Sequence, residues 1–467
     1  MSKIILGGGI SGLSAAYYLS KTLPKHPVTL VEASNRVGGW IKSFKPTNEV
    51  IFEQGPRTIR PTGPPGANTL SLIEDLGLTD QVLPITASHP AASNRMVYVE
   101  GKLHSLPSSI VSLFTTQKPF TKPMVRYLMR DLYAARKRVE DESIYDFTSR
   151  RFGEEFAEYL IAPLICGVCA GDAKEVSVKF LMKKQFEYEQ AYGSISKGLL
   201  RNVFQASKPE ALQGLALRAR KERWRIYSFG NGMETLPEAL SGYITKQGIG
   251  VVLNSKCTRL EFVQNEAQLH FGESKTLKTN HVISSIPSAS LGEVVKHQHP
   301  RLAELLTSIK SVNVAVVNLH YKGQLIRRPG FGFLVPPKEN VPILGVIYDS
   351  CCFPRSKDTV LTVMMGGKWF EQLFGEDPSE DYLLQVARGQ LHTILGIKQE
   401  PVHFKVSILQ KCIPQYVVGH DEKVREIQEY IDTNKLPLSV CGASYHGVGV
   451  NDVILSAKKV VRNLSER

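Results

Sequence analysis

Three features that would assign a protein class directly are missing from this sequence. Its 467 residues contain only seven cysteines, an odd number in a long chain, so a disulfide framework is not expected and a reducing compartment is favoured. No run of about eighteen apolar residues occurs, and we therefore predict no transmembrane helix. A strand pattern begins at Lys3 and leaves no room for a secretory signal or a cleavable presequence, so any organelle address is expected inside the chain.

Several binding and catalytic motifs are also absent. The sequence has no zinc-finger spacing, basic zipper or aromatic RNA-binding signature, so nucleic acid is not an expected partner. Cys166 and Cys169 form C-x-x-C, but no second ligand pair and no thioredoxin-like setting accompanies them. We interpret this pair, like Cys351 and Cys352, as structural. We find no convincing Ser-His-Asp or paired-carboxylate arrangement, and we predict no metal site.

Positive charge is what the sequence has in excess. It carries 57 Lys and Arg against 44 Asp and Glu, a net charge of +13, in a composition that is otherwise typical of a globular enzyme. Such a charge favours polyanions, anionic membrane surfaces or acidic substrates, without choosing among them.

A glycine-rich loop gives the first positive indication of function. Gly7, Gly9 and Gly12 form G-x-G-x-x-G between a predicted buried strand at 3–6 and a helical pattern. These glycines allow a tight turn, close approach of the backbone to a pyrophosphate, and close packing of helix on strand. Glu32 ends the second strand, where an acid binds ribose hydroxyls and disfavours a 2′-phosphate. We therefore predict a dinucleotide site that does not take NADP.

A second glycine pair narrows the choice of cofactor. Gly38 and Gly39 stand between Arg36 and Trp40, and they offer more backbone and charge to a pyrophosphate. Here the sequence resembles the superfamily of FAD-dependent amine oxidases and protoporphyrinogen oxidases, whose first βαβ unit continues into E-x-x-x-R-x-G-G. NAD dehydrogenases usually lack that extension. The resemblance therefore implies FAD as the cofactor.

Four further segments make the resemblance more specific. They lie at 53–61 (EQGPRTIRP), 89–95 (HPAASNR), 412–416 (CIPQY) and 442–452 (GASYHGVGVND). Together they resemble, from end to end of the chain, the oxygen-dependent protoporphyrinogen oxidases of the mitochondrial type. That family oxidises protoporphyrinogen IX to protoporphyrin IX in haem biosynthesis. The resemblance implies an oxidoreductase acting on CH–CH groups, which removes six electrons through FAD and produces hydrogen peroxide from oxygen.

The resemblance also implies a set of site residues. Arg95 would pair with a substrate propionate, for which its planar fork is suited, and Phe331 and Leu334 would form apolar walls of the substrate pocket. The flavin itself takes the hydride, so no catalytic side chain is implied. The residues implied around FAD are Gly7, Gly8, Gly9, Ile10, Ser11, Gly12, Glu32, Ala33, Arg36, Gly39, Trp40, Gly55, Pro56, Arg57, Thr58, Cys257 (through its backbone, near the adenine), Ala443, Val448, Gly449 and Val450.

The C-terminal glycine cluster has a mechanistic interpretation. Its glycines permit close backbone approach, and a helix expected from about Asn451 would direct its N-terminal dipole at the flavin pyrimidine, where reduced flavin is negative. Asn451 as a plain helix cap is the alternative, and both roles are compatible. The cluster departs from the family at His446 and Gly449, where an acid or small polar group and Ala or Ser are expected. No side-chain role is carried over to these two positions.

The order of strand and helix patterns indicates an α/β protein. We predict a Rossmann-like FAD-binding domain of the GR2 or amine-oxidase type, a mixed-sheet substrate-binding domain and a helical, membrane-associating domain. The expected boundaries are 1–90, 216–295 and 411–467 for the three parts of the FAD-binding domain, 91–215 for the helical domain and 296–410 for the substrate domain.

A basic, amphipathic stretch lies in the predicted helical domain. Between Gln117 and Glu140, Lys and Arg interleave with apolar residues, among them Leu132 and Tyr133, that fit one face of a helix starting near Pro123. Such a stretch either docks on anionic lipid or is a solvated helix, and a hydrophobic substrate favours docking. The resemblance implies peripheral attachment to the mitochondrial inner membrane, a homodimer, and hand-over of the product to ferrochelatase.

Two alternative functions remain at this stage. Another flavin amine oxidase or a carotenoid desaturase would share the FAD site but not the substrate. A GDP-dissociation-inhibitor-like binding protein would share the fold and the glycine loop but bind no flavin, although such proteins lack the continuous second glycine cluster seen here.

Overall fold

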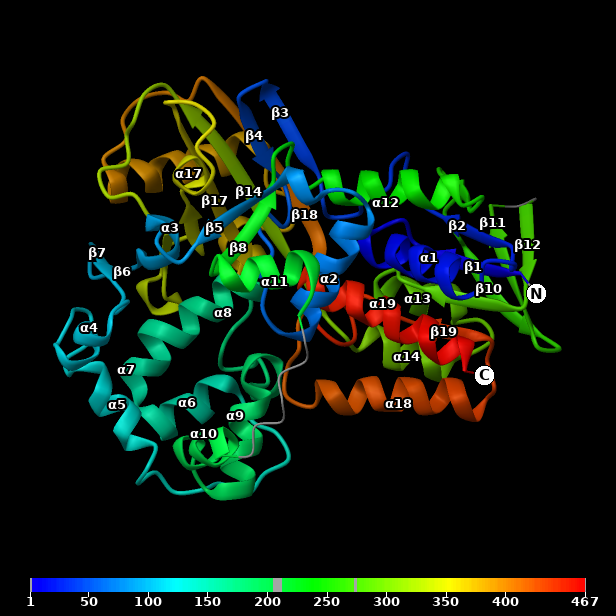
Figure 1. Ribbon diagram of the computed structural model, residues 1–467, viewed down its shortest axis with the longest axis horizontal. Helices are drawn as coiled ribbons and strands as arrows, with labels where there is room; N and C mark the ends of the chain where they lie inside the picture. Colours follow the sequence, from blue (N-terminus) through cyan, green and yellow to red (C-terminus); the bar gives the residue numbers. More distant parts are fainter. Residues whose placement is uncertain (1, 205–211, 273–274, 467) are drawn as a thin grey trace.

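The structure is a computed structural model that describes residues 2–204, 212–272 and 275–466. Figure 1 shows a parallel sheet with its helices on the right, a long antiparallel sheet at the upper left, and a helical lobe at the lower left. Both chain termini lie on the side of the parallel sheet.

The parallel sheet combines strands from three distant parts of the sequence. Its strand order is β19 (Leu438–Val440), β13 (His281–Ser284), β1 (Lys3–Leu6), β2 (Val28–Val31) and β9 (Gly250–Val252), and every neighbouring pair is parallel. All four residues of β1 are buried, as expected of a strand whose sheet is covered on both faces. The predicted strands at the two ends of this βαβ unit are confirmed.

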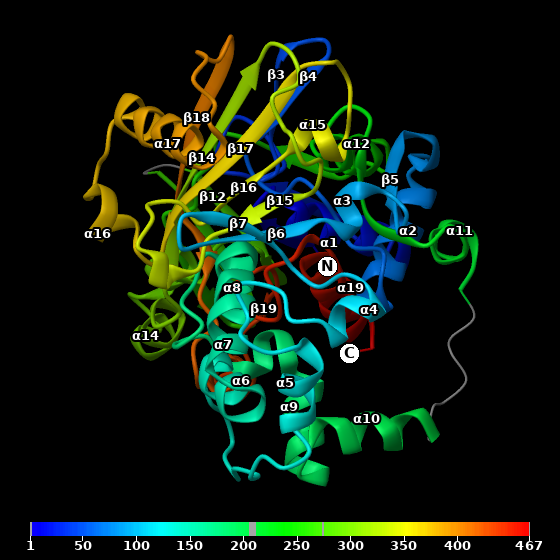
Figure 2. The ribbon, with the colours of Figure 1, turned by 90° about the vertical axis from the view of Figure 1, so that its left-hand side faces the viewer.

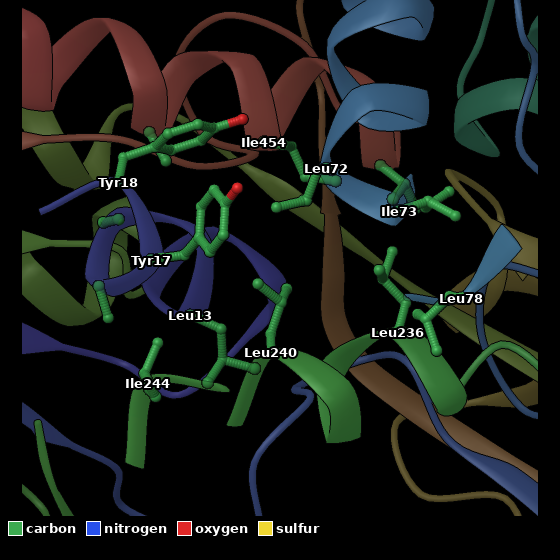
Figure 3. Close-up of a cluster of buried hydrophobic side chains, with 14 of the residues drawn as sticks. Leu13, Tyr17, Tyr18, Leu72, Ile73, Leu78, Leu236, Leu240, Ile244 and Ile454 are labelled. Carbon is green, nitrogen blue, oxygen red and sulfur yellow. The ribbon is translucent and has the colours of Figure 1, made fainter. Parts of the chain in front are cut away.

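Helices from both ends of the chain cover one face of this sheet. They are α1 (Ile10–Thr22), α2 (Gly63–Asp75), α11 (Gly214–Lys221), α12 (Thr235–Lys246) and α19 (Val450–Ser465). Figure 3 shows their shared core, in which Leu13 of α1 lies beside Leu240 of α12, and Ile454 of α19 belongs to the same buried cluster. This apolar packing joins the N-terminal glycine loop to the last helix of the chain.

The opposite face of the parallel sheet is covered by a small antiparallel sheet and three helices. Ile4 and Val282 point into this second core, whereas Ile5 and Ile283 point into the first, as the alternation of side chains along a strand requires. The elements are β10 (Arg259–Val263), β11 (Glu266–Phe271), β12 (Lys275–Thr279), α13 (Ser288–Val295), α14 (Pro300–Thr307) and α18 (His420–Thr433).

A seven-stranded sheet forms the second region. Its order is β18 (His403–Pro414), β14 (Ser311–Tyr321), β17 (Thr359–Gly367), β16 (Gly345–Ile347), β15 (Gly332–Leu334), β6 (Arg95–Val99) and β7 (Lys102–Ser105). Its described pairs are antiparallel except β15 with β6. Helices α16 (Phe370–Phe374) and α17 (Glu380–Leu395) pack on it. Residues 95–105, which the sequence analysis grouped with the helical segment, thus belong to this sheet; the other predicted boundaries stay predictions.

The helical lobe lies below that sheet, and Figure 2 shows α8 pointing from it toward β6 and β15. The lobe consists of α4 (Ile110–Phe114), α5 (Met124–Arg130), α6 (Ile144–Phe152), α7 (Glu154–Phe156), a π-helical turn (Ala157–Ile161), α8 (Ala162–Cys169), α9 (Val178–Tyr192) and α10 (Ile195–Phe204). None of the helices in the described ranges is long and apolar enough to cross a bilayer.

The helix expected from Pro123 is shorter than its apolar pattern suggests. It begins at Met124 but ends at Arg130, so the prediction that Leu132 and Tyr133 continue its face is wrong. Asp131 is fully buried at the helix end, where Arg151 donates to its carboxylate. This long-range polar contact redirects the chain and overrides the local periodicity.

Short elements connect the three regions. They are the ribbons β3 (Ser43–Thr47) with β4 (Val50–Glu53) and β5 (Val82–Thr86) with β8 (Trp224–Phe229), the helices α3 (Pro90–Ser93) and α15 (Asp349–Cys352), and two 3-10 turns, Thr79–Gln81 and Pro337–Glu339.

Candidate functional site

The N-terminal glycine loop, residues 7–12, lies where predicted, between β1 and α1. Gly7 has φ of +100°, and a β-carbon on Gly12 would lie 1.9 Å from the Gly7 carbonyl oxygen, so the turn requires glycine at both positions. Gly9 is the N-cap of α1 and offers no capping side chain. The first amides of α1, at Ile10 and Ser11, are therefore available to an anionic group.

Glu32 lies at the end of β2 and binds the glycine loop directly. The Gly8 amide donates to Oε2 over 2.6 Å, and the Ser34 hydroxyl donates to Oε1 over 2.8 Å. A carboxylate oxygen accepts more than one hydrogen bond, so a ribose hydroxyl also fits. The Ser255 amide donates to the Glu32 carbonyl, which brings the segment leading to Cys257 to the same end of the sheet as Glu32 and Ala33.

The Arg36 side chain binds backbone carbonyl groups of the second glycine turn. Its guanidinium donates to the carbonyl oxygens of Val37, Gly39 and Ile41 and forms a 3.2 Å ion pair with Glu234. Arg36 therefore stabilises the turn that was predicted to meet the pyrophosphate. The Glu234 carboxylate partly neutralises the positive charge of Arg36. The sequence analysis missed Glu234, which lies about two hundred residues away.

The two glycine turns meet a third segment that follows β4. The Gly38 amide donates to the Gly8 carbonyl over 2.8 Å. The side chain of Trp40 is 42% exposed. The backbone carbonyl oxygen of Trp40 would lie 1.9 Å from a β-carbon on Gly55, so only glycine fits there. The segment Gly55 to Thr58, with Pro56 between, is thus packed against the backbone of the second glycine turn.

Arg57 in this third segment is buried and forms a 3.0 Å ion pair with Asp349 of α15. Glu53, just before it, accepts hydrogen bonds from the Met233 amide and the Ser43 hydroxyl, both 2.8 Å long. Burial raises the pKa of Glu53 to about 7, although these two hydrogen bonds and the Arg57 charge oppose the shift. The sequence analysis assigned no role to Glu53, because its partners come from distant segments.

The C-terminal glycine cluster reaches the same place from the other end of the chain. Gly449 is the N-cap of α19 and again offers no capping side chain. The Asn451 side chain donates to the Arg60 carbonyl over 2.7 Å, and Ser11 lies 3.3 Å from the Cys441 sulfur. These contacts bring residues 7–12, 55–60 and 441–451 together, which include Ala443, Val448 and Val450.

The assembled segments fit FAD. Two helices, α1 and α19, present N-termini without side-chain caps, and such ends attract phosphates and a negative ring. Within the described residues, the Oδ1 of Asn451 is buried and accepts no hydrogen bond, as expected if a bound ligand supplies the donor. The residues around the three glycine segments would hold the dinucleotide, with Glu32 toward the ribose and Val448 to Val450 toward the ring.

Of the three residues predicted for the substrate, Arg95 and Leu334 lie on two neighbouring strands and Phe331 directly precedes one of them. Arg95 starts β6 and pairs with Gly332 of β15, and the Phe331 amide donates to the Asn94 carbonyl over 3.1 Å. Phe331 and Leu334 are half-buried at this edge. The structure thus places Arg95 on the strand next to that of Leu334, and Phe331 next to Asn94, the residue before Arg95.

Arg95 is exposed and has no acidic partner within the described residues. Desolvation, followed by the positive charges of Arg60 and Arg225, lowers the pKa of Arg95. Three arginines therefore lie near one another, and no described ion pair neutralises them. A cluster of this kind attracts carboxylate groups, and the sequence analysis named only one of its three members.

Leu334 is also in contact with the helical lobe. A β-carbon on Gly167 of α8 would lie 2.7 Å from the Leu334 Cδ2. The flanking Cys166 and Cys169 are buried, and burial raises the pKa of both thiols, that of Cys169 to about 12. No group of metal-binding side chains occurs in the part of the chain that the structure describes. The structural interpretation of this C-x-x-C pair fits these observations.

Comparison with known proteins agrees with this geometry. The family model of flavin-containing amine oxidoreductases matches residues 10–465, and the chain belongs to that family. A protoporphyrinogen oxidase of Bos taurus is 41% identical over 98% of this chain and 96% of its own length, and one of Homo sapiens is 40% identical over the same shares. A solved structure from Exiguobacterium superposes with a TM-score of 0.81 at 22% identity, covering 100% of this chain and 98% of that one.

Family membership separates an FAD-dependent enzyme from a flavin-free binding protein. The chain is an FAD-dependent oxidoreductase, so the predictions of FAD, of an α/β flavoprotein fold and of an enzyme are confirmed. A flavin-free binding protein is not favoured.

Proposed function

We propose that the chain oxidises protoporphyrinogen IX to protoporphyrin IX in haem biosynthesis, with oxygen as the acceptor. The substrate loses six hydrogen atoms, and three oxygen molecules become three molecules of hydrogen peroxide. The observation that carries this proposal is the whole-length identity of about 40% to the two mammalian protoporphyrinogen oxidases. Arg95 on β6, with Phe331 and Leu334 at the neighbouring strand β15, supplies the matching chemistry for a dipropionate macrocycle.

The residues of the chain bind and orient the substrate. FAD, when bound, accepts a hydride from the substrate and returns the electrons to oxygen. Arg95 pairs with a propionate, which fixes the edge of the macrocycle. Phe331 and Leu334 exclude water from the apolar face of the macrocycle. Gly167, which has no side chain, leaves the space that the Leu334 side chain occupies. We place Ala443, Val448, Gly449 and Val450 along the flavin, with the N-terminus of α19 stabilising negative charge there.

Oxygen consumption with protoporphyrinogen IX tests this function. Purified holoprotein is mixed with the reduced tetrapyrrole, and porphyrin fluorescence is followed together with oxygen. We expect three oxygen molecules consumed for each porphyrin formed, and no turnover of a primary amine under the same conditions. Heat-denatured protein measures the spontaneous oxidation. Amine turnover without porphyrin formation would place the chain with the amine oxidases instead.

We also propose that the helical lobe attaches the protein peripherally to the mitochondrial inner membrane. Helix α4 exposes three large apolar side chains, Ile110 (78%), Val111 (73%) and Phe114 (65%). Lys118, Lys122 and Arg126, close by in sequence, are exposed and belong to no ion pair of the described residues. An apolar tip with a basic border is suited to an anionic bilayer. A homodimer and hand-over of the product to ferrochelatase complete this proposal, on the family resemblance alone.

Vesicle flotation tests the attachment. Wild-type protein should float with vesicles of phosphatidylcholine and cardiolipin at low salt, and the double substitution Ile110→Asp with Phe114→Asp should remain in the pellet fraction. Phe404→Asp is the matched control, because Phe404 is 49% exposed but lies on β18 of the seven-stranded sheet. Flotation of the double variant at the wild-type level would contradict attachment through α4.

A further inference from the structure

Tyr416 connects two points of the C-terminal glycine cluster with a single hydroxyl group. Its hydroxyl donates to the Ala443 carbonyl over 2.6 Å and accepts from the Gly447 amide over 2.7 Å. The tyrosine itself is buried and follows β18, outside the cluster. One side chain therefore determines how far apart Ala443 and Gly447 lie.

The Tyr416 ring is held from both sides. It stacks on the His420 ring with a centroid distance of 3.8 Å and an angle of 12°, and Phe180 of α9 meets it edge-on at 5.1 Å. The Ser177 amide donates to the Tyr416 carbonyl over 2.8 Å. Helices of two different regions thus fix the ring, so the hydroxyl has little freedom to follow the glycine cluster if that cluster moves.

The glycine cluster needs such an external support. Gly442 and Gly447 have φ of +104° and +135°, conformations that few side chains adopt, and glycine loses more conformational entropy on ordering than any other residue. The cluster also joins the end of β19 to the N-terminus of α19. A small displacement of residues 443–447 therefore moves the amide groups at the start of that helix.

We propose that Tyr416 is a positioning residue for the flavin ring. Its hydroxyl holds Ala443 and Gly447 at the separation in which Val448 to Val450 meet the ring, without touching the ring itself. This inference rests on the proposed placement of the flavin along Ala443 and Val448 to Val450. The neighbouring Gln415, whose amide donates to the Cys169 carbonyl over 2.9 Å, anchors the same segment to the helical lobe.

The chain offers a matched control within the cluster itself. Tyr445 is buried, and among the described residues its hydroxyl has no hydrogen-bond partner. The substitution Tyr445→Phe therefore removes a buried hydroxyl and no hydrogen bond, whereas Tyr416→Phe removes a hydroxyl and two hydrogen bonds and keeps the stacked ring. The two variants therefore differ in the hydrogen bonds to Ala443 and Gly447, which the proposal requires.

The experiment compares both variants as holoproteins by FAD dissociation, the visible absorbance spectrum of the flavin and its midpoint potential. Tyr416→Phe should release FAD about tenfold more readily, since each lost hydrogen bond to a neutral group weakens binding several-fold, and should shift the spectrum and the potential. Tyr445→Phe should match the wild type in all three measurements. A Tyr416→Phe protein that melts earlier but keeps the flavin spectrum, potential and affinity would show a merely structural role and overturn the proposal.

If Tyr416→Phe does not fold, amide hydrogen exchange of the wild type tests whether the Tyr416 hydroxyl holds the Gly447 amide. The Gly447 amide should exchange slowly in the FAD-bound protein, and rapid exchange there would overturn the proposal. Both measurements are independent of the substrate. A wild-type flavoprotein that fails to oxidise protoporphyrinogen IX would refute the proposed function and leave the comparison of Tyr416 with Tyr445 intact.

Discussion

Gly167 and Leu334 fit together across the boundary between the helical lobe and the seven-stranded sheet. A β-carbon on Gly167 would lie 2.7 Å from one methyl group of Leu334 and 3.2 Å from the other. A β-carbon on Gly345 of the neighbouring strand β16 would likewise lie 3.0 Å from the Leu334 side chain. Leu334 is therefore held between two glycines, and the lobe contributes to the wall that we assign to the substrate.

Gly167→Ala should displace Leu334 into the substrate space. The atom in contact is the end of a flexible side chain, so the protein should fold and retain FAD. The KM for protoporphyrinogen IX should rise about tenfold, the effect of one misplaced methyl group in an apolar pocket. Steady-state oxygen consumption and the ratio of FAD to protein measure the two expectations.

Gly242→Ala is the control for that substitution. Gly242 lies within α12, and apart from its chain neighbours and the backbone of its own helix no described atom lies within 4 Å of a β-carbon placed there. Its replacement should leave KM unchanged and stabilise the helix by up to about 1 kcal/mol. An unaltered KM in Gly167→Ala would remove Leu334 from the substrate wall.

Arg95→Ala should weaken substrate binding without loss of FAD. A charge-assisted hydrogen bond contributes about 1.5–3 kcal/mol, so KM should rise between about tenfold and a hundredfold. Arg95→Lys should give an intermediate value, because lysine keeps the charge but lacks the planar fork. Arg301→Ala, an exposed change on α14, should have no effect. Equal KM values for the wild type and Arg95→Ala would reject a propionate contact at this residue.

The elements that the sequence predicted correctly are those whose signals are local. The strand at 3–6 and α19 each have a hydrophobic pattern and a turn at their ends within the segment itself. The glycine loop and Glu32 were recognisable for the same reason, since a strand, a turn and a helix follow one another directly. FAD could be predicted because the two glycine turns and Glu32, which carry the family resemblance, all lie within the first forty residues.

The parts that could not be predicted depend on contacts between distant segments. Nothing near Tyr416 in the sequence indicates that its hydroxyl meets Ala443 and Gly447. Gly167 was read as part of a C-x-x-C pair, although its function in the fold is to leave space for Leu334. The length of α5 was mispredicted because the ion pair between Asp131 and Arg151 overrides an amphipathic pattern.

That ion pair belongs to a buried network in the helical lobe. Arg151, Asp131 and Glu189 are fully buried, and Arg150 pairs with Glu189 over 2.6 Å. Burial alone would raise the pKa of Asp131 and of Glu189. Hydrogen bonds, from the Ser196 amide and other donors to Asp131 and from Arg150 to Glu189, outweigh it and lower both pKa values.

Arg151→Met should destabilise the protein by about 3–5 kcal/mol at pH 7, because it leaves buried carboxylates without their partner. The wild type should lose stability as the pH falls below about 4.5, where the unfolded carboxylates bind protons before the folded ones do. Urea unfolding at several pH values tests both points. Arg218→Met is the control: its pair with Glu222 is exposed to solvent, so the change should cost far less than Arg151→Met. Equal losses from the two changes would contradict a buried network.

Glu53 should give the opposite pH dependence. Its pKa of about 7 in the folded protein lies above its ordinary value of 4.5, mainly because it is buried. The folded state therefore holds this proton more tightly than the unfolded chain does. Its contribution to stability is complete below about pH 4.5 and is lost as the pH rises to about 7, by about 3 kcal/mol in all.

Glu53→Gln should remove that dependence, because the amide takes the place of the protonated acid and cannot ionise. Relative to the wild type, the variant should be more stable at pH 8 than at pH 5, when both proteins are unfolded by urea with excess FAD present. Glu100→Gln, at an exposed turn after β6, should show no such difference. If the stability of Glu53→Gln relative to the wild type does not change between pH 5 and pH 8, Glu53 is already ionised in the folded protein at pH 5, and Arg57 outweighs its burial.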